Sequence, residues 1–165
     1  RIANTEEAET PAATHVGERL DRAPEVGVRV PPRGQALDGH VAEAVTTYAP
    51  APGPCSAGEK NLCLQGGQFK VEVAWAVPSQ AASGAASAVS LTGDTGYFWF
   101  FTSNNVELVV KVVDGRAVND KYWVFYGALS DVQYTVTVTD TQTGAIRTYL
   151  NTSGTQASAA DTTAF

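Results

Sequence analysis

The sequence predicts an all-β fold: an antiparallel, immunoglobulin-like β-sandwich of about seven strands that follows an extended N-terminal arm. Three observations lead to this prediction. Five aromatic residues stand in a row at Tyr97–Phe101, between the turn signals Thr92–Thr95 and Ser103–Asn105. Several further segments alternate apolar with polar residues, which is the pattern of a half-buried strand. No segment carries a convincing pattern for a long helix.

Residues 1–54 are predicted to form the arm, and residues 55–165 the sandwich. The arm holds seven of the eight prolines, both histidines and only one of the fifteen aromatic residues, Tyr48. Such a segment buries too little apolar surface to offset its ordering entropy alone, so we expect it to lie on its own domain or on a neighbouring subunit.

Within the arm, residues 25–30 alternate as a strand does, and Pro31 and Pro32 end that pattern. Residues 40–48 fit either a short helix capped by Asp38 or an extended segment, and the extended form is slightly favoured. The apolar groups that the arm can offer to a docking site are Val26, Val28, Val30, Val41, Val45 and Tyr48.

The strands of the sandwich are predicted in order from their alternation and from the turns between them. They cover residues 69–77, 88–92, 97–101, 106–113, 122–126, 132–139 and 145–150. Residues 79–87 are expected to form a flexible loop, and the tail after Asn151 to be irregular. Asp140 and Gly144 are expected to close a hairpin, because Asp supplies a side-chain turn bond and Gly a positive φ.

In the strand over residues 106–113, one face is expected to point inward and the other outward. The inward residues are Val106, Leu108, Val110 and Val112, and Glu107 and Lys111 are expected to point to solvent. In the strand over residues 69–77, the inward residues are Phe69, Val71, Val73, Trp75 and Val77.

Cys55 and Cys63 are predicted to form a disulfide. They stand in a segment rich in Gly and Pro, with no second cysteine pair that would indicate a zinc site. Two free buried thiols are the alternative. A disulfide indicates an oxidising compartment, and the absence of Met together with abundant Thr, Ser and Gly fits a secreted or cell-surface bacterial protein.

Five segments together resemble a module found near the C-termini of many secreted, mostly uncharacterised bacterial proteins. The segments are 63–71, 96–101, 105–112, 122–125 and 140–144, so the resemblance covers roughly residues 55–165 and leaves out the arm. The resemblance implies export and a β module. It implies no catalytic residue.

The sequence does not predict an enzyme, a metal site or a cofactor. His15 and His40 both lie in the arm, so the sandwich has no histidine of its own for a Ser-His-Asp or Cys-His site. Glu72 and Glu107 are better explained as residues on the solvent face of a strand than as a pair of catalytic carboxylates. Asp residues at 94, 114, 120 and 140 fit turn chemistry better than calcium ligation.

Composition limits the partners. The chain of 165 residues has a formal net charge of -6 and 44% hydrophobic residues, which suffices for one core with an appendage. Nucleic acid and anionic membranes are not expected partners, since both need clustered Lys and Arg. No run of about eighteen apolar residues indicates membrane insertion. The chain starts at Arg1, as a processed mature protein or a trimmed chain would.

Two functional hypotheses follow. The first is a non-enzymatic extracellular structural subunit whose arm docks on other copies of itself, with strand addition as one route, to form an oligomer or filament. The second is a secreted carbohydrate- or protein-binding module with the arm as a linker. In that case Trp75, Trp99 or Trp123 would form an exposed aromatic surface, although such residues more often fill a core.

Overall fold

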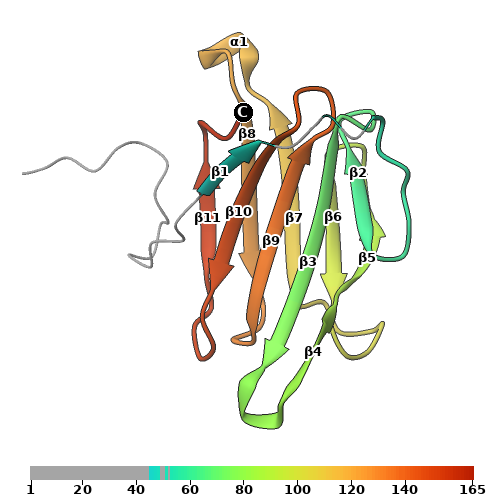
Figure 1. Cartoon of the computed structure of the whole chain (residues 1–165), viewed down its shortest axis with the longest axis vertical. Coiled ribbons are helices and arrows are strands. Elements are labelled where there is room, and N and C mark those ends of the chain that lie inside the picture. The colour runs from blue at the N-terminus through green and yellow to red at the C-terminus, as the bar shows by residue number, and fades with distance from the viewer. Residues whose placement is uncertain (1–44, 49–50, 52) are drawn as a thin grey trace, which may run out of the picture. The chain divides into compact units, whose positions relative to one another are not determined.

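The computed structural model describes residues 45–48, 51 and 53–165, and within them the chain forms a two-sheet β-sandwich (Figure 1). The predicted strand at 25–30 and the arm residues Val26, Val28, Val30 and Val41 lie outside these described residues. The strands are β1 Val45–Tyr48, β2 Asn61–Leu64, β3 Phe69–Val77, β4 Ala82–Ala85, β5 Ser87–Ser90, β6 Thr95–Trp99, β7 Leu108–Asp114, β8 Tyr122–Ala128, β9 Gln133–Asp140, β10 Ala145–Asn151 and β11 Ser158–Asp161. A 3₁₀ turn, Pro78–Gln80, and a short helix α1, Arg116–Asn119, complete the order.

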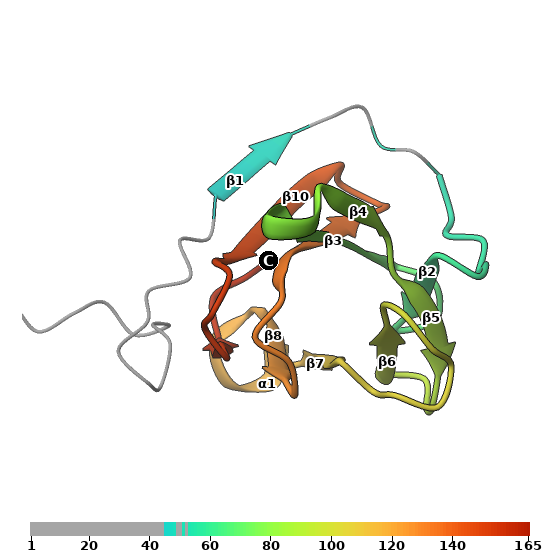
Figure 2. The ribbon, with the colours of Figure 1, turned by 90° about the horizontal axis from the view of Figure 1, so that it is seen from below.

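The two sheets face each other across one core. The first has the order β1-β10-β9-β3-β2, with β4 also paired to β3, and the second has the order β11-β8-β7-β6-β5. All the strand pairs are antiparallel. Figure 2, seen along the strands, shows the first sheet above and the second below. The predicted sandwich is therefore confirmed.

The pair β3–β9 lies at the middle of the first sheet and has the longest register, from Phe69 opposite Asp140 to Ala76 opposite Gln133. Phe69, Val71 and Val73, which share one face of β3, are buried, and every second residue of β9 from Tyr134 onward is also buried. The predicted inward face of β3 is confirmed for Phe69, Val71 and Val73, and Trp75 is partly buried against the core, whereas Val77 is not part of the core cluster.

The aromatic segment departs from its predicted form at its C-terminal end. Strand β6 ends at Trp99, so Phe100 and Phe101 lie beyond it. Phe98 is fully buried in the core, and Phe100 is also buried, with its ring stacked on Trp75 at 6.3 Å between centroids. The chain thus turns after Trp99 and places a second phenylalanine in the interior.

The prediction for residues 79–87 and for the tail was wrong. Residues 82–85 form β4, which pairs with Ala74–Val77 of β3, and residues 158–161 form β11, which pairs with β8. Both strands consist of small or polar residues, so they lack the apolar alternation that sequence analysis can detect. They form because a neighbouring strand offers unpaired main-chain groups. The described residues hold eleven strands, against about seven predicted.

The prediction that Glu107 points to solvent was also wrong, because Glu107 is only 4% exposed. A buried carboxylate needs a hydrogen-bond donor, and the side-chain amide of Asn105 donates to Glu107. Leu108, Val110 and Val112 are buried and Lys111 is exposed, as predicted. Val106, predicted to point inward, precedes β7 and is only partly buried.

The predicted hairpin between β9 and β10 is confirmed. The Asp140 carboxylate accepts hydrogen bonds from the Gln142 amide at 3.0 Å and from the Thr143 hydroxyl at 2.7 Å. Gly144 has a φ of 77°, which a residue without a Cβ adopts at little cost. This turn fixes the register of β10 against β9.

Truncation of the core aromatic should unfold the protein far more readily than truncation of the one beyond the strand. Phe98→Ala is expected to lower the free energy of unfolding by about 3–5 kcal/mol, because Phe98 is buried among core side chains from both sheets. The matched control is Phe101→Ala, whose side chain is 50% exposed and should lose less than half as much. Chemical denaturation measures both, and equal losses would contradict the assignment.

Candidate functional site

Strand β1 is the part of the predicted arm that the structure describes, and it pairs with the outer edge of β10. The register is antiparallel and runs from Val45 opposite Thr148 to Tyr48 opposite Ala145. Residues 45–48 are therefore extended, which is the form that the sequence favours over a short helix. The side chains of Thr46, Thr47 and Tyr48 are exposed, that of Tyr48 by 78%. Main-chain pairing, rather than burial of these side chains, holds the strand in place.

Arg147 of β10 connects this edge to the end of the chain. Its guanidinium donates to the carbonyl oxygens of Ala164 and, at 3.2 Å, Thr163, and also to the hydroxyl of Thr46 on β1. Arg147 stands opposite Val138, so it takes a position that points to the interior side of the sheet. An arginine at an inward position of a strand was the signal that the sequence analysis missed.

A cleft of about 300 Å³ lies beside β1 at this edge. Tyr48 and Thr46 line it from β1, Arg147 from β10, and Lys121 and Phe165 from the end of the second sheet. The Phe165 ring packs on the ring of Phe69 at 5.1 Å, and its main chain exchanges hydrogen bonds with Tyr122. The floor of the cleft is therefore part of the folded sandwich, while its β1 wall is not part of the core.

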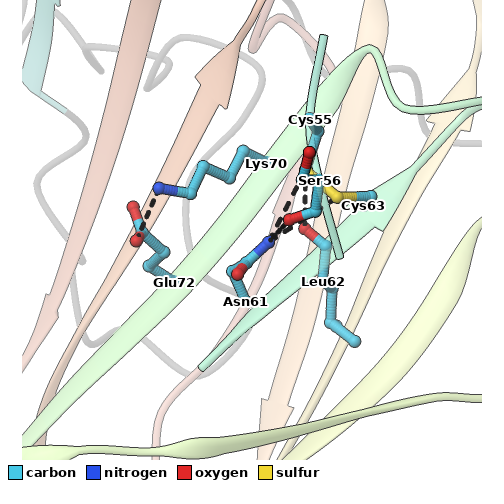
Figure 3. Close-up of polar contacts among 7 residues, drawn as sticks. All are labelled: Cys55, Ser56, Asn61, Leu62, Cys63, Lys70 and Glu72. Atoms are coloured by element: carbon cyan, nitrogen blue, oxygen red, sulfur yellow. Dashed lines mark hydrogen bonds and ion pairs between the residues drawn. A yellow bond between two sulfur atoms is a disulfide. The ribbon is translucent and has the colours of Figure 1, made fainter. Parts of the chain in front are cut away.

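The disulfide predicted between Cys55 and Cys63 is confirmed (Figure 3). Cys63 lies on β2, and the Cys55 amide donates to the carbonyl oxygen of Gly67 at 3.2 Å. The side-chain amide of Asn61 donates to the Ser56 carbonyl oxygen at 2.8 Å. These contacts fix the chain at Cys55 against the turn between β2 and β3.

Two of the three tryptophans lie on the outer face of the second sheet. Trp99 alternates with the buried Phe98 on β6, and Trp123 alternates with the buried Val124 on β8, so both point away from the core. Tyr97 and Phe125 share this face, and all four rings are half-buried. Sequence analysis did not single out Tyr97 or Phe125 for this surface, although their period-two spacing from the tryptophans was visible.

The ring of Trp123 is held against a glycine. A Cβ on Gly115 would lie 2.2 Å from the Trp123 indole, and the Trp123 ring nitrogen donates to the Asn119 side chain at 2.8 Å. The Phe125 ring packs edge-on against the same indole. This tryptophan is therefore fixed in orientation.

Trp99 borders a second recess, of about 370 Å³, which Glu59, Lys60 and Ser87 also line. The Lys60 ammonium lies 6.0 Å from the centre of the Trp99 ring and donates to the Ser87 hydroxyl at 2.8 Å. An indole beside a charged group and a hydroxyl can stack on a sugar ring and bond to its hydroxyl groups.

The structure does not bring the three tryptophans together. Trp123 stands opposite Val113, and Tyr97 opposite Val109, so six residue positions separate Trp99 and Trp123 along the sheet, roughly 20 Å. Trp75 lies on the inner side of β3, where it contacts Phe100 and, at 4.9 Å, Phe101. One flat platform of all three rings is therefore excluded.

In the part of the chain that the structure describes, no group of three or more His, Cys, Asp or Glu side chains could hold a metal ion. Nor does any helix in that part have the length and hydrophobicity needed to cross a membrane. His15 and His40 are outside the described residues.

Comparison with known proteins gives no identity to transfer. The chain matches no family model, no curated protein and no solved structure. What the fold defines is a class of architecture, a disulfide-bonded β-sandwich that carries an added strand on one sheet edge.

Removal of the disulfide should cost a measurable part of the stability. In the chain-entropy model, a loop this short contributes about 2–3 kcal/mol. A variant with Cys55→Ser and Cys63→Ser should lose that amount in chemical denaturation. Reductant should destabilise the natural protein by a similar amount and leave the double variant unchanged, and a natural protein insensitive to full reduction would contradict this expectation.

Proposed function

We propose that this protein is a non-enzymatic extracellular structural subunit that assembles with other copies of itself through its N-terminal arm. The observation that carries the proposal is the pairing of β1 with β10, since the described part of the arm already adds a strand to a sheet edge. Strand addition gives affinity through main-chain hydrogen bonds and needs no catalytic group. The disulfide is compatible with an extracellular location.

The division of apolar residues between arm and sandwich supports this proposal. Among the residues that the structure describes, every buried hydrophobic residue of the core cluster lies between Leu62 and Ala164. The arm offers only a few valines and Tyr48. They are too few for a second core but enough to fill a groove or to set the register of an added strand.

The buried acids support a structural rather than a catalytic role. Asp161 accepts a hydrogen bond from the Tyr149 hydroxyl at 2.9 Å and from the Thr163 amide, and burial beside this carboxylate raises the pKa of Tyr149. Asp140 accepts a hydrogen bond from a main-chain amide of its hairpin, and Glu107 accepts one from the side-chain amide of Asn105. Each of these carboxylates thus stabilises local structure.

Deletion of residues 1–50 should leave a folded monomer. The deletion removes β1 and the rest of the arm, and none of the described residues that it removes belongs to the core cluster. Circular dichroism should report the β fold, while sedimentation velocity and electron microscopy should show loss of the oligomer that the full chain forms. A truncated protein that assembles like the full chain would overturn the proposal.

A point variant tests whether assembly needs the apolar side chains of the arm and not only its length. Val28→Asp is expected to weaken assembly, because it places a charge where an apolar residue would enter a groove. Val28→Thr is the matched control, since it keeps the β-branched shape.

The aromatic outer face favours a second candidate function, a secreted carbohydrate-binding module. Trp99 beside Lys60 and Ser87 would be the contact for a sugar ring. Trp99→Ala should weaken binding of a soluble oligosaccharide, measured by tryptophan fluorescence, by roughly tenfold, since such stacking contributes about 1–1.5 kcal/mol. Trp123→Ala, roughly 20 Å away along the sheet, is the control. This candidate fails if the full chain binds none of a panel of plant and bacterial oligosaccharides.

A further inference from the structure

We propose that β1 is exchanged between copies, so that β1 of one chain occupies the β10 edge of another in the register of the present structure. This inference rests on the proposed function and deepens it, because it names the donor strand and the receiving edge. The partner is a second copy of this chain.

The first argument is the way β1 is held. Four residue pairs join β1 to β10, and the side chains of Thr46, Thr47 and Tyr48 remain exposed. The contacts are therefore mainly between main-chain groups along one edge. A second copy presents an identical edge and an identical strand, so an exchanged pair forms the same hydrogen bonds and loses none of the contacts made within one chain.

The second argument is that the receiving edge is built without β1. Arg147 is fixed by the carbonyl oxygens of Thr163 and Ala164, and β10 is paired along its other side with β9. Phe165 is seated against Phe69 and Tyr122. The edge that pairs with β1 is thus made by core strands and by the end of the chain, whichever copy supplies β1.

The third argument is the reach of the connection from β1 to the sandwich. Tyr48 lies at one margin of the first sheet, and Cys55 is fixed on the far side, at the turn between β2 and β3. Three to four strand spacings separate these margins, roughly 14–19 Å. The seven steps from Tyr48 to Cys55 span only about 22 Å in a proline-rich segment.

The composition of that connection also favours exchange. Residues 49–54 contain three prolines, Pro50, Pro52 and Pro54. Pairing within one chain, as in the present structure, uses most of the available length. Proline restricts the backbone conformations of a short connection, and short restricted connections favour exchange of a terminal strand with a neighbour's edge.

Cysteine cross-linking between two full-length chains tests the exchange. One chain carries Thr47→Cys and the other Ile146→Cys, because these residues stand opposite each other in the β1–β10 register. The chains carry different tags and are expressed together, so that they fold and assemble in the same compartment. On mild oxidation we expect a disulfide-linked heterodimer on a non-reducing gel.

The matched control replaces Ile146→Cys with Leu150→Cys. Leu150 is 50% exposed and lies on the same face of β10, but it is beyond the four residues that pair with β1. The heterodimer yield for the Thr47–Ile146 pair should be several-fold higher than for this control. A yield no higher than that of the control overturns the exchange.

A third sample places Thr47→Cys and Ile146→Cys in one chain. Links between chains are expected to predominate, and a product linked only within single chains overturns the exchange. The proposed function fails separately, if deletion of residues 1–50 leaves assembly unchanged. If that deletion abolishes assembly and the mixed chains still do not link, the exchange alone is wrong.

Discussion

Pairing of the main-chain groups at the edges of the two sheets governs how this structure is built. A sandwich leaves outer strands with unpaired main-chain groups, and each must be paired, covered or exposed to another chain. On one side the sheets are joined directly: β4 in the first sheet continues through the buried Ala86 into β5 of the second, and the Ala88 amide donates to the Glu59 carbonyl oxygen. On the other side β1 covers the margin of the first sheet, beside the last residues of the chain.

On that second side, one side chain contacts both the folded sandwich and the strand that the proposed assembly uses. Arg147 joins the receiving strand to the residues after β11, so the same side chain that closes the sandwich also contacts the added strand. The core does not need β1, because none of its described side chains is buried in the core cluster. A strand that completes an edge without contributing to the core is well suited to be supplied by a neighbour, since its loss leaves the fold intact.

The outer face of the second sheet carries aromatic rings that are separate from the β1 edge. Its aromatic rings are only half-buried, yet Trp123 is held in place by Gly115 and Asn119, and Trp99 is bordered by Lys60. Such fixed rings lose little conformational entropy when a ligand or protein surface covers them. The face and the β1 edge belong to different sheets, so the proposed assembly through the edge would leave these rings uncovered.

Local patterns in the sequence suffice to predict the sandwich, its central strands, the hairpin at Asp140 and the disulfide, because each depends on alternation, a turn signal or two close cysteines. Tertiary structure alone decided β4 and β11, whose small residues form strands only because β3 and β8 present unpaired main-chain groups beside them. It also decided that Trp99 and Trp123 point away from the core and lie far apart on one outer face. Alternation tells which residues share a face of a strand, but the other sheet determines which face is buried.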